Sequence, residues 1–235
     1  MTKHVLLLSS SALYGTQYLD HAETEVRLFL GDRKEVLFAP FALLDMDAYA
    51  KRARERFAAM GYNVTSLHEK TDKRQAIINT EALFIGGGNT FRLLNALYKY
   101  DLLTVIRGRV EDGMPYMGSS AGSNVACPTI KTTNDMPIIQ PPSFDALGLV
   151  SFQVNPHYLD PDLNSTHMGE TREMRINEFH EENSAPVVGL REGTMLLIDG
   201  DAIRLKGERT ARVFRKGFAP IEVPPGAELS EILKS

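Results

Sequence analysis

Short runs of apolar residues alternate along the chain with longer stretches whose apolar residues recur at helical spacing. The runs are rich in valine, isoleucine, leucine and phenylalanine, and they are continuous rather than alternating. Continuous apolar runs are typical of strands that are covered on both faces. We therefore expect strands at residues 5–9, 36–40, 63–68, 83–86, 116–119, 152–155 and 187–191.

The stretches between these runs predict helices. The clearest covers residues 47–60, where Tyr49, Ala53 and Phe57 share one side and charged residues fill the other. It ends at Gly61, a residue that often terminates helices. Others are expected after Asp72 and over residues 90–98 and 170–182. This alternation predicts an α/β fold with a doubly wound, mostly parallel sheet and ligands at the C-terminal ends of its strands.

The C-terminal part of the chain changes character. Residues 194–198 and 202–206 flank Asp199-Gly200-Asp201, which is a hairpin signal, and residues 211–214 suit a third short antiparallel strand. We expect an antiparallel hairpin appended to the sheet edge, within one domain that covers residues 1–235.

Composition narrows the class of protein. The chain of 235 residues is 43% hydrophobic and 24% charged, as in soluble globular proteins, and its net charge of −4 argues against nucleic-acid binding. A single cysteine, Cys127, cannot form an internal disulfide, which favours a reducing compartment. The apolar run near the N-terminus is too short for a signal peptide or a membrane span. We predict a cytoplasmic protein.

A candidate nucleophile lies in the segment Gly118-Ser119-Ser120-Ala121-Gly122. It has the pattern Gly-x-Ser-x-Gly, follows a predicted strand and precedes a helical segment, which is the setting that a nucleophilic serine requires. Ser120 is the predicted nucleophile. The alternative is that Ser119 or Ser120 only caps the helix.

The base that activates Ser120 is predicted to be His157. It follows a strand that ends at Pro156, so it lies on a loop at a C-terminal strand end, the edge where Ser120 emerges. Of the other histidines, His4 precedes the first expected strand, and His21 and His68 lie in expected loop or strand-end positions. His167 and His180 lie beside or on the helix expected over residues 170–182, and His157 is the first choice.

Two acids are candidates to orient the imidazole. Glu192 ends an apolar strand, and Asp135 lies on a loop after the candidate nucleophile. The sequence does not separate them.

An oxyanion site is predicted at the segment Gly86-Gly87-Gly88-Asn89-Thr90, where a strand runs into three glycines and then a helix. The amides of Gly88 and Ala121 are the expected donors. The same turn could instead hold a phosphate, but it matches neither the P-loop nor the dinucleotide-binding pattern. No H-E-x-x-H motif occurs, and we expect no metal and no cofactor.

Taken together, four motifs resemble the dipeptidase E family of α-aspartyl dipeptidases: Gly86-Gly87-Gly88-Asn89-Thr90, Gly118-Ser119-Ser120-Ala121-Gly122, Thr133-Asn134-Asp135-Met136-Pro137 and Asn155-Pro156-His157. The resemblance implies a cytosolic serine peptidase that removes aspartate from Asp-Xaa dipeptides. It also implies a fold related to class I glutamine amidotransferases, in which a cysteine stands at the position of Ser120. The resemblance further implies that Ser120 is the nucleophile and His157 the base, and that the third member is the acid at the position of either Asp135 or Glu192.

An N-terminal aspartate requires a cation for its side chain and an acid for its ammonium group. Arg172 and Arg175 stand three residues apart on a predicted helix and are the candidate cations. Asp135 can hold the ammonium group if Glu192 orients His157, and Asn89 can hold other polar groups. We expect a small peptide as the partner, neither nucleic acid nor membrane, and a monomer or a homodimer. The alternatives are a serine esterase of broad specificity and a non-catalytic module that binds a small anion.

Overall fold

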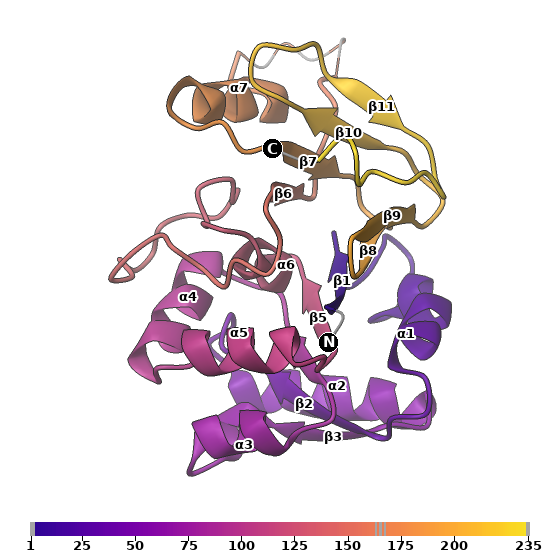
Figure 1. The fold of residues 1–235 in the computed structure, drawn as a ribbon, viewed down its shortest axis with the longest axis vertical. Coiled ribbons are helices and arrows are strands. Elements are labelled where there is room, and N and C mark those ends of the chain that lie inside the picture. The colour runs from indigo at the N-terminus through magenta and orange to yellow at the C-terminus, as the bar shows by residue number, and fades with distance from the viewer. Residues whose placement is uncertain (1–2, 163, 165, 167, 234–235) are drawn as a thin grey trace.

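A computed structural model describes residues 3–162, 164, 166 and 168–233. In this part of the chain a seven-stranded sheet has the order β3-β2-β4-β5-β1-β8-β9 (Figure 1). Its strands are β1 (His4–Leu8), β2 (Glu35–Ala39), β3 (Asn63–Ser66), β4 (Leu83–Ile85), β5 (Tyr116–Ser119), β8 (Met195–Asp199) and β9 (Ala202–Lys206). The first five in this order are parallel, and β8 and β9 form an antiparallel hairpin beside β1. The doubly wound sheet and the edge hairpin are as the sequence predicted.

Both faces of the sheet are buried at its central parallel strands, which is why these strands read as continuous apolar runs. Along β1, Val5 and Leu7 enter one core cluster, and Leu6 and Leu8 enter the other. Helices α1 (Glu23–Leu30) and α2 (Met46–Ala59) supply apolar residues to the second cluster. The first cluster draws on α3 (Lys73–Asn79), α4 (Thr90–Lys99), α5 (Leu103–Glu111) and α6 (Ala121–Ala126).

Helix starts follow the capping residues in the sequence. Asp45 accepts a hydrogen bond from Ala48 N, and Asp72 accepts one from Gln75 N. Of the predicted elements, residues 63–68 differ in part, because β3 ends at Ser66 and Leu67–Glu69 form a 3₁₀ helix, η2. A second short 3₁₀ helix, η1, covers Asp20–Ala22. None of the described helices is long and apolar enough to cross a membrane.

A second sheet was not expected. It has the order β11-β10-β7-β6 and contains β6 (Gln153–Pro156), β7 (Val187–Leu190), β10 (Ala211–Phe214) and β11 (Ile221–Val223). With α7 (Arg172–Glu182) it forms one end of the molecule (Figure 1). The predicted strand at 211–214 exists, but it pairs with β7 and β11 rather than with the hairpin. The C-terminal ends of the parallel strands β6 and β7 lie against the end of β1, because Ser9 hydrogen-bonds to His157 N and Leu190 O. In the larger sheet β1 is the neighbour of β5, and β5 of β4.

Candidate active site

Ser120 occupies a sharp turn between β5 and α6. Its backbone has φ 51° and ψ −106°, a conformation that a residue with a side chain rarely adopts. Such strain is typical of a nucleophile held above the edge of a sheet. Ser120 stands at the N-cap position of α6, yet its side chain makes no capping hydrogen bond. The geometry therefore does not favour the alternative that Ser120 is only a cap.

The glycines around Ser120 are required by close packing. A Cβ atom on Gly118 would lie 2.5 Å from the carbonyl oxygen of Gly122, and one on Gly122 would lie 2.2 Å from the carbonyl oxygen of Ile85. Both distances are well inside van der Waals contact, and both opposing atoms belong to the backbone. The Gly-x-Ser-x-Gly spacing thus lets α6 pack directly on β4 and β5.

His157 and Glu192 meet Ser120 from the second sheet. His157 Nε2 lies 3.0 Å from Ser120 Oγ, and His157 Nδ1 lies 2.8 Å from Glu192 Oε1. His157 directly follows β6, and Glu192 lies just after β7. If Nδ1 carries the proton, it donates to the carboxylate and leaves Nε2 free to accept the serine proton. Of the other histidines considered, His167 lies outside the described residues.

Asp135 has a different partner. Its Oδ2 accepts a hydrogen bond of 2.7 Å from Thr90 N, at the start of α4. Nearby, Asn89 Nδ2 donates to Met136 O at 2.8 Å, while Asn89 Oδ1 caps α4 by accepting from Arg92 N at 3.0 Å. The loop that contains Asp135 is thus tied to the glycine turn. Asn89 has two such internal contacts, and its role in holding substrate stays a prediction.

The glycine turn lies against the candidate nucleophile. A Cβ atom on Gly87 would lie 3.1 Å from Ser120 Cβ. Gly88 has φ +135°, and a Cβ atom there would lie 2.6 Å from Ala42 O, so only glycine fits. Ala121 N is the first amide of α6, and such an amide has no hydrogen-bond acceptor within its helix. The oxyanion role of the Gly88 and Ala121 amides stays a prediction.

The two candidate arginines have different surroundings. Arg172 Nη1 donates to Asn134 Oδ1 at 2.8 Å, and Asn134 Nδ2 donates to Pro156 O at 2.9 Å, next to His157. Burial lowers the pKa of the Arg172 guanidinium; Arg175 adds to this shift and Asp135 opposes it.

Arg175, in contrast, forms an exposed ion pair with Glu170, with 3.3 Å between Nε and Oε2. Only Arg172 is tied to the strand that carries His157. Sequence reasoning had assigned no role to Asn134, because only the folded loop places its amide between Arg172 and that strand.

The single thiol is not available as a nucleophile. Cys127 is fully buried at the end of α6, and burial raises its pKa to about 12. Its Sγ accepts a hydrogen bond of 3.3 Å from Val154 N. That Ser120 is the nucleophile stays a prediction, and Cys127 is not a competing candidate.

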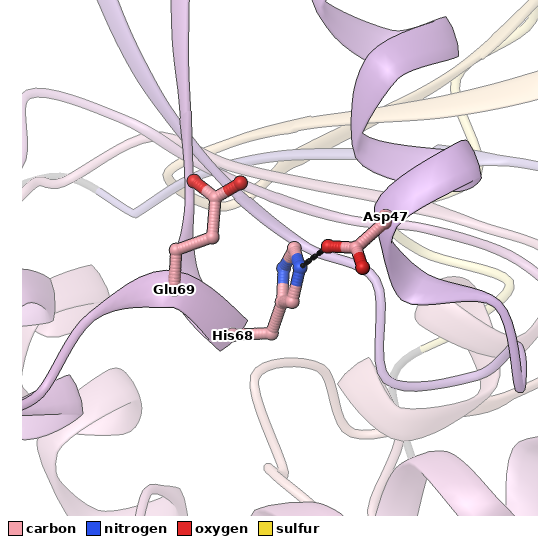
Figure 2. Close-up of side chains that lie close together, drawn as sticks. All are labelled: Asp47, His68 and Glu69. Atoms are coloured by element: carbon pink, nitrogen blue, oxygen red, sulfur yellow. Dashed lines mark hydrogen bonds and ion pairs between the residues drawn. The ribbon is translucent and has the colours of Figure 1, made fainter.

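One group of possible metal ligands occurs among the described residues, away from Ser120. Asp47 lies in the first turn of α2, and His68 and Glu69 lie in η2 (Figure 2). His68 Nε2 lies 2.9 Å from Asp47 Oδ1, and Glu69 forms an ion pair with Arg54. These contacts give each side chain a partner within the protein. The expectation of a metal-free protein stays a prediction.

A family profile and two proteins of similar sequence all match nearly the whole chain. A sequence profile of peptidase family S51 matches residues 5–206. The chain is 52% identical to a protein named peptidase E from Streptomyces coelicolor, over 98% of this chain and 95% of that protein. It is 48% identical to a probable alpha-aspartyl dipeptidase from Drosophila melanogaster, over 99% and 98% of the two chains.

Solved structures support the same fold. The structure of a peptidase from an acI-B1 actinobacterium superposes with a TM-score of 0.74 at 16% identity, covering 97% of this chain and 96% of that one. A putative peptidase E from Listeria monocytogenes superposes with a TM-score of 0.68 at 21% identity, covering 88% and 99%.

Proposed function

The chain belongs to peptidase family S51, and from this premise we propose that it is a serine dipeptidase that removes the N-terminal aspartate from Asp-Xaa dipeptides. The observation that carries the proposal is the hydrogen-bonded series from Ser120 Oγ through the His157 imidazole to the Glu192 carboxylate. The substrate class follows the relatives, one of which is named a probable alpha-aspartyl dipeptidase.

The proposed reaction has two steps that use the same imidazole. Ser120 Oγ attacks the carbonyl carbon of the aspartyl residue while His157 Nε2 takes the hydroxyl proton. The Gly88 and Ala121 amides stabilise the oxyanion that forms. The peptide C–N bond then breaks, and His157 returns the proton to the leaving amine. Water, deprotonated by His157, hydrolyses the aspartyl ester and regenerates Ser120.

We assign the orienting acid to Glu192. Its carboxylate is within hydrogen-bond distance of His157 Nδ1, so it favours the productive tautomer and stabilises the imidazolium ion. Asp135 instead holds the start of α4, and with it the oxyanion turn, through Thr90 N. It remains our candidate for the acid that receives the substrate's ammonium group.

Substrate specificity provides the test of this function. We expect the protein to hydrolyse Asp-Leu. We expect kcat/KM for Ala-Leu to be lower by at least about 100-fold, because Ala-Leu lacks the side-chain carboxylate that the proposed cation binds. Initial rates with both dipeptides and with a simple alanyl ester measure this. Comparable rates on all three would instead support the broad-specificity esterase.

Arg172 is predicted to bind the aspartate side chain. Replacing Arg172 with Met, which keeps an unbranched side chain, should raise KM for Asp-Leu by about 10- to 100-fold, the effect expected from losing a hydrogen-bonded charge pair. The matched control is Arg175→Met on the same helix, which should change KM by less than about threefold because that ion pair is exposed. Equal effects of the two substitutions would refute the assignment.

We also propose that the protein works in the cytoplasm. The proposal rests on its single cysteine, Cys127, which is buried and has no second thiol in the chain to pair with.

A further inference from the structure

The end of β1 lies at the centre of the candidate site and connects its parts. Ser120 N donates a hydrogen bond of 3.0 Å to Leu8 O, the last carbonyl of β1. The nucleophile is thereby tied to the residue that directly precedes Ser9. Ser9 and Ser10 belong to a run of serines at residues 9–11.

Ser9 connects β1 with both strands that lead to His157 and Glu192. Its side chain is fully buried, and its Oγ accepts a hydrogen bond of 3.0 Å from His157 N. The same hydroxyl donates to Leu190 O at 2.8 Å, at the end of β7. One hydroxyl group therefore joins the end of β1, in the first sheet, to the ends of β6 and β7, in the second.

The contact with His157 matters because the backbone there is strained. His157 has φ 54°, in the left-handed region that residues with a side chain rarely adopt. Such a conformation persists only where the surroundings hold it. The hydrogen bond to Ser9 holds the amide of the strained residue itself, so its loss should let the imidazole move relative to Ser120.

Ser10 makes a longer hydrogen bond beside Glu192. It is buried, and its Oγ accepts a hydrogen bond of 3.3 Å from Gly193 N, next to Glu192. Consecutive residues at the end of β1 thus contact the backbone at, or next to, all three members of the Ser120–His157–Glu192 group.

We propose that Ser9, assisted by Ser10, is a positioning residue that sets the His157 imidazole between Ser120 Oγ and the Glu192 carboxylate. The inference rests on the proposed function. Ser9 does not touch the reacting atoms. It acts by joining the end of β1 to the ends of β6 and β7, which belong to a different sheet.

Ser66 offers a matched control for burial. It is also a fully buried serine at the end of a parallel strand of the same sheet, and its Oγ contacts Phe38 O at 3.4 Å. Its neighbours lie in β2 and η2, away from the candidate site. A Ser66→Ala variant therefore reports the cost of removing a buried hydroxyl without altering His157.

The kinetic test compares these variants on Asp-Leu. We expect Ser9→Ala to lower kcat by about 10- to 100-fold while KM stays within about threefold, because a small displacement of a catalytic group lowers turnover more than binding. Ser66→Ala should leave kcat within about twofold. Ser9→Cys keeps a side chain of similar size with a weaker acceptor and should give an intermediate kcat. It also serves if Ser9→Ala does not fold.

A second readout does not depend on substrate. The His157 Nδ1 proton bonded to Glu192 should give a strongly downfield proton NMR signal, assigned by its loss in His157→Gln. We expect Ser9→Ala and Ser9→Cys to weaken or broaden the signal and Ser66→Ala to retain it. If the wild type is inactive on Asp-Leu but the signal behaves in this way, only the proposed function fails. If either Ser9 variant folds and keeps both the wild-type signal and kcat, the positioning role is wrong.

Discussion

Replacing Ser120 with alanine lowers kcat for Asp-Leu by about 10⁵-fold or more in our account, because the substitution removes the atom that forms the ester. The variant should fold normally, since the Ser120 side chain makes no capping hydrogen bond that alanine would lose. Calorimetry should therefore show that Ser120→Ala still binds Asp-Leu while steady-state assays show no turnover.

The adjacent serine provides the control for that variant. Ser119 is fully buried, and its Oγ has no hydrogen-bond partner among the described residues. Ser119→Ala removes an unsatisfied hydroxyl, so it should leave kcat within about twofold and leave stability unchanged or slightly higher. If Ser120→Ala retained the wild-type function, the non-catalytic binding module would be the better account.

The second large effect concerns the two acids. Glu192→Gln should lower kcat by about 10³- to 10⁴-fold with little change in KM, because an amide can donate to Nδ1 and so favour the wrong imidazole tautomer. Asp135→Asn keeps an oxygen that can accept from Thr90 N. The Asp135→Asn variant should therefore lower kcat by only about 10-fold, and it should raise KM by a similar factor because the substrate's ammonium group loses a charged partner. Steady-state kinetics on Asp-Leu separate the two.

Matched thermal unfolding curves are the control for this comparison, because Asp135 also supports the fold around α4. A Glu192 variant with wild-type kcat, or an Asp135 variant that loses turnover without any effect on KM, would contradict the assignment of the acids.

The proximity of Ser120 and His157 was expected from the Gly-x-Ser-x-Gly segment together with the strand ends that precede both residues. Ser120 and His157 each follow a predicted strand, and C-terminal strand ends meet at one edge in α/β folds. The structure places their side chains 3.0 Å apart. The sequence could not separate Glu192, which ends a predicted strand, from Asp135, because the loop that contains Asp135 could reach the same edge. Only the folded loops show that Asp135 faces Thr90 and Glu192 faces His157.

The fold class was predicted correctly, but the pairing of the strands was predicted only in part. Strands β6 and β7 were identified closely, but their sheet was not, because a buried apolar run looks the same whichever strand it pairs with. Helix α1 was missed, although Val26, Phe29 and Leu30 carry the helical spacing. It is short, and helices of that length give weak periodic signals.

A residue whose role depends on hydrogen bonds to distant backbone atoms has no recognisable sequence motif. The role inferred for Ser9 depends on contacts with residues far away in sequence, at His157 and Leu190. A serine after a strand is common, and no spacing rule connects it with a histidine in another sheet. Such positions emerge only when long-range contacts are known.

The most direct test of the proposed mechanism uses added hydroxylamine, which competes with water for the aspartyl ester on Ser120. The measured quantity is the ratio of the two products. The aspartyl ester on Ser120 is the same whatever amine has left, so the ratio of aspartyl hydroxamate to free aspartate should be identical for Asp-Leu, Asp-Ala and Asp-Phe. A ratio that changes with the leaving residue, or cleavage that yields no hydroxamate from any of them, would contradict an acyl-enzyme formed by Ser120, His157 and Glu192.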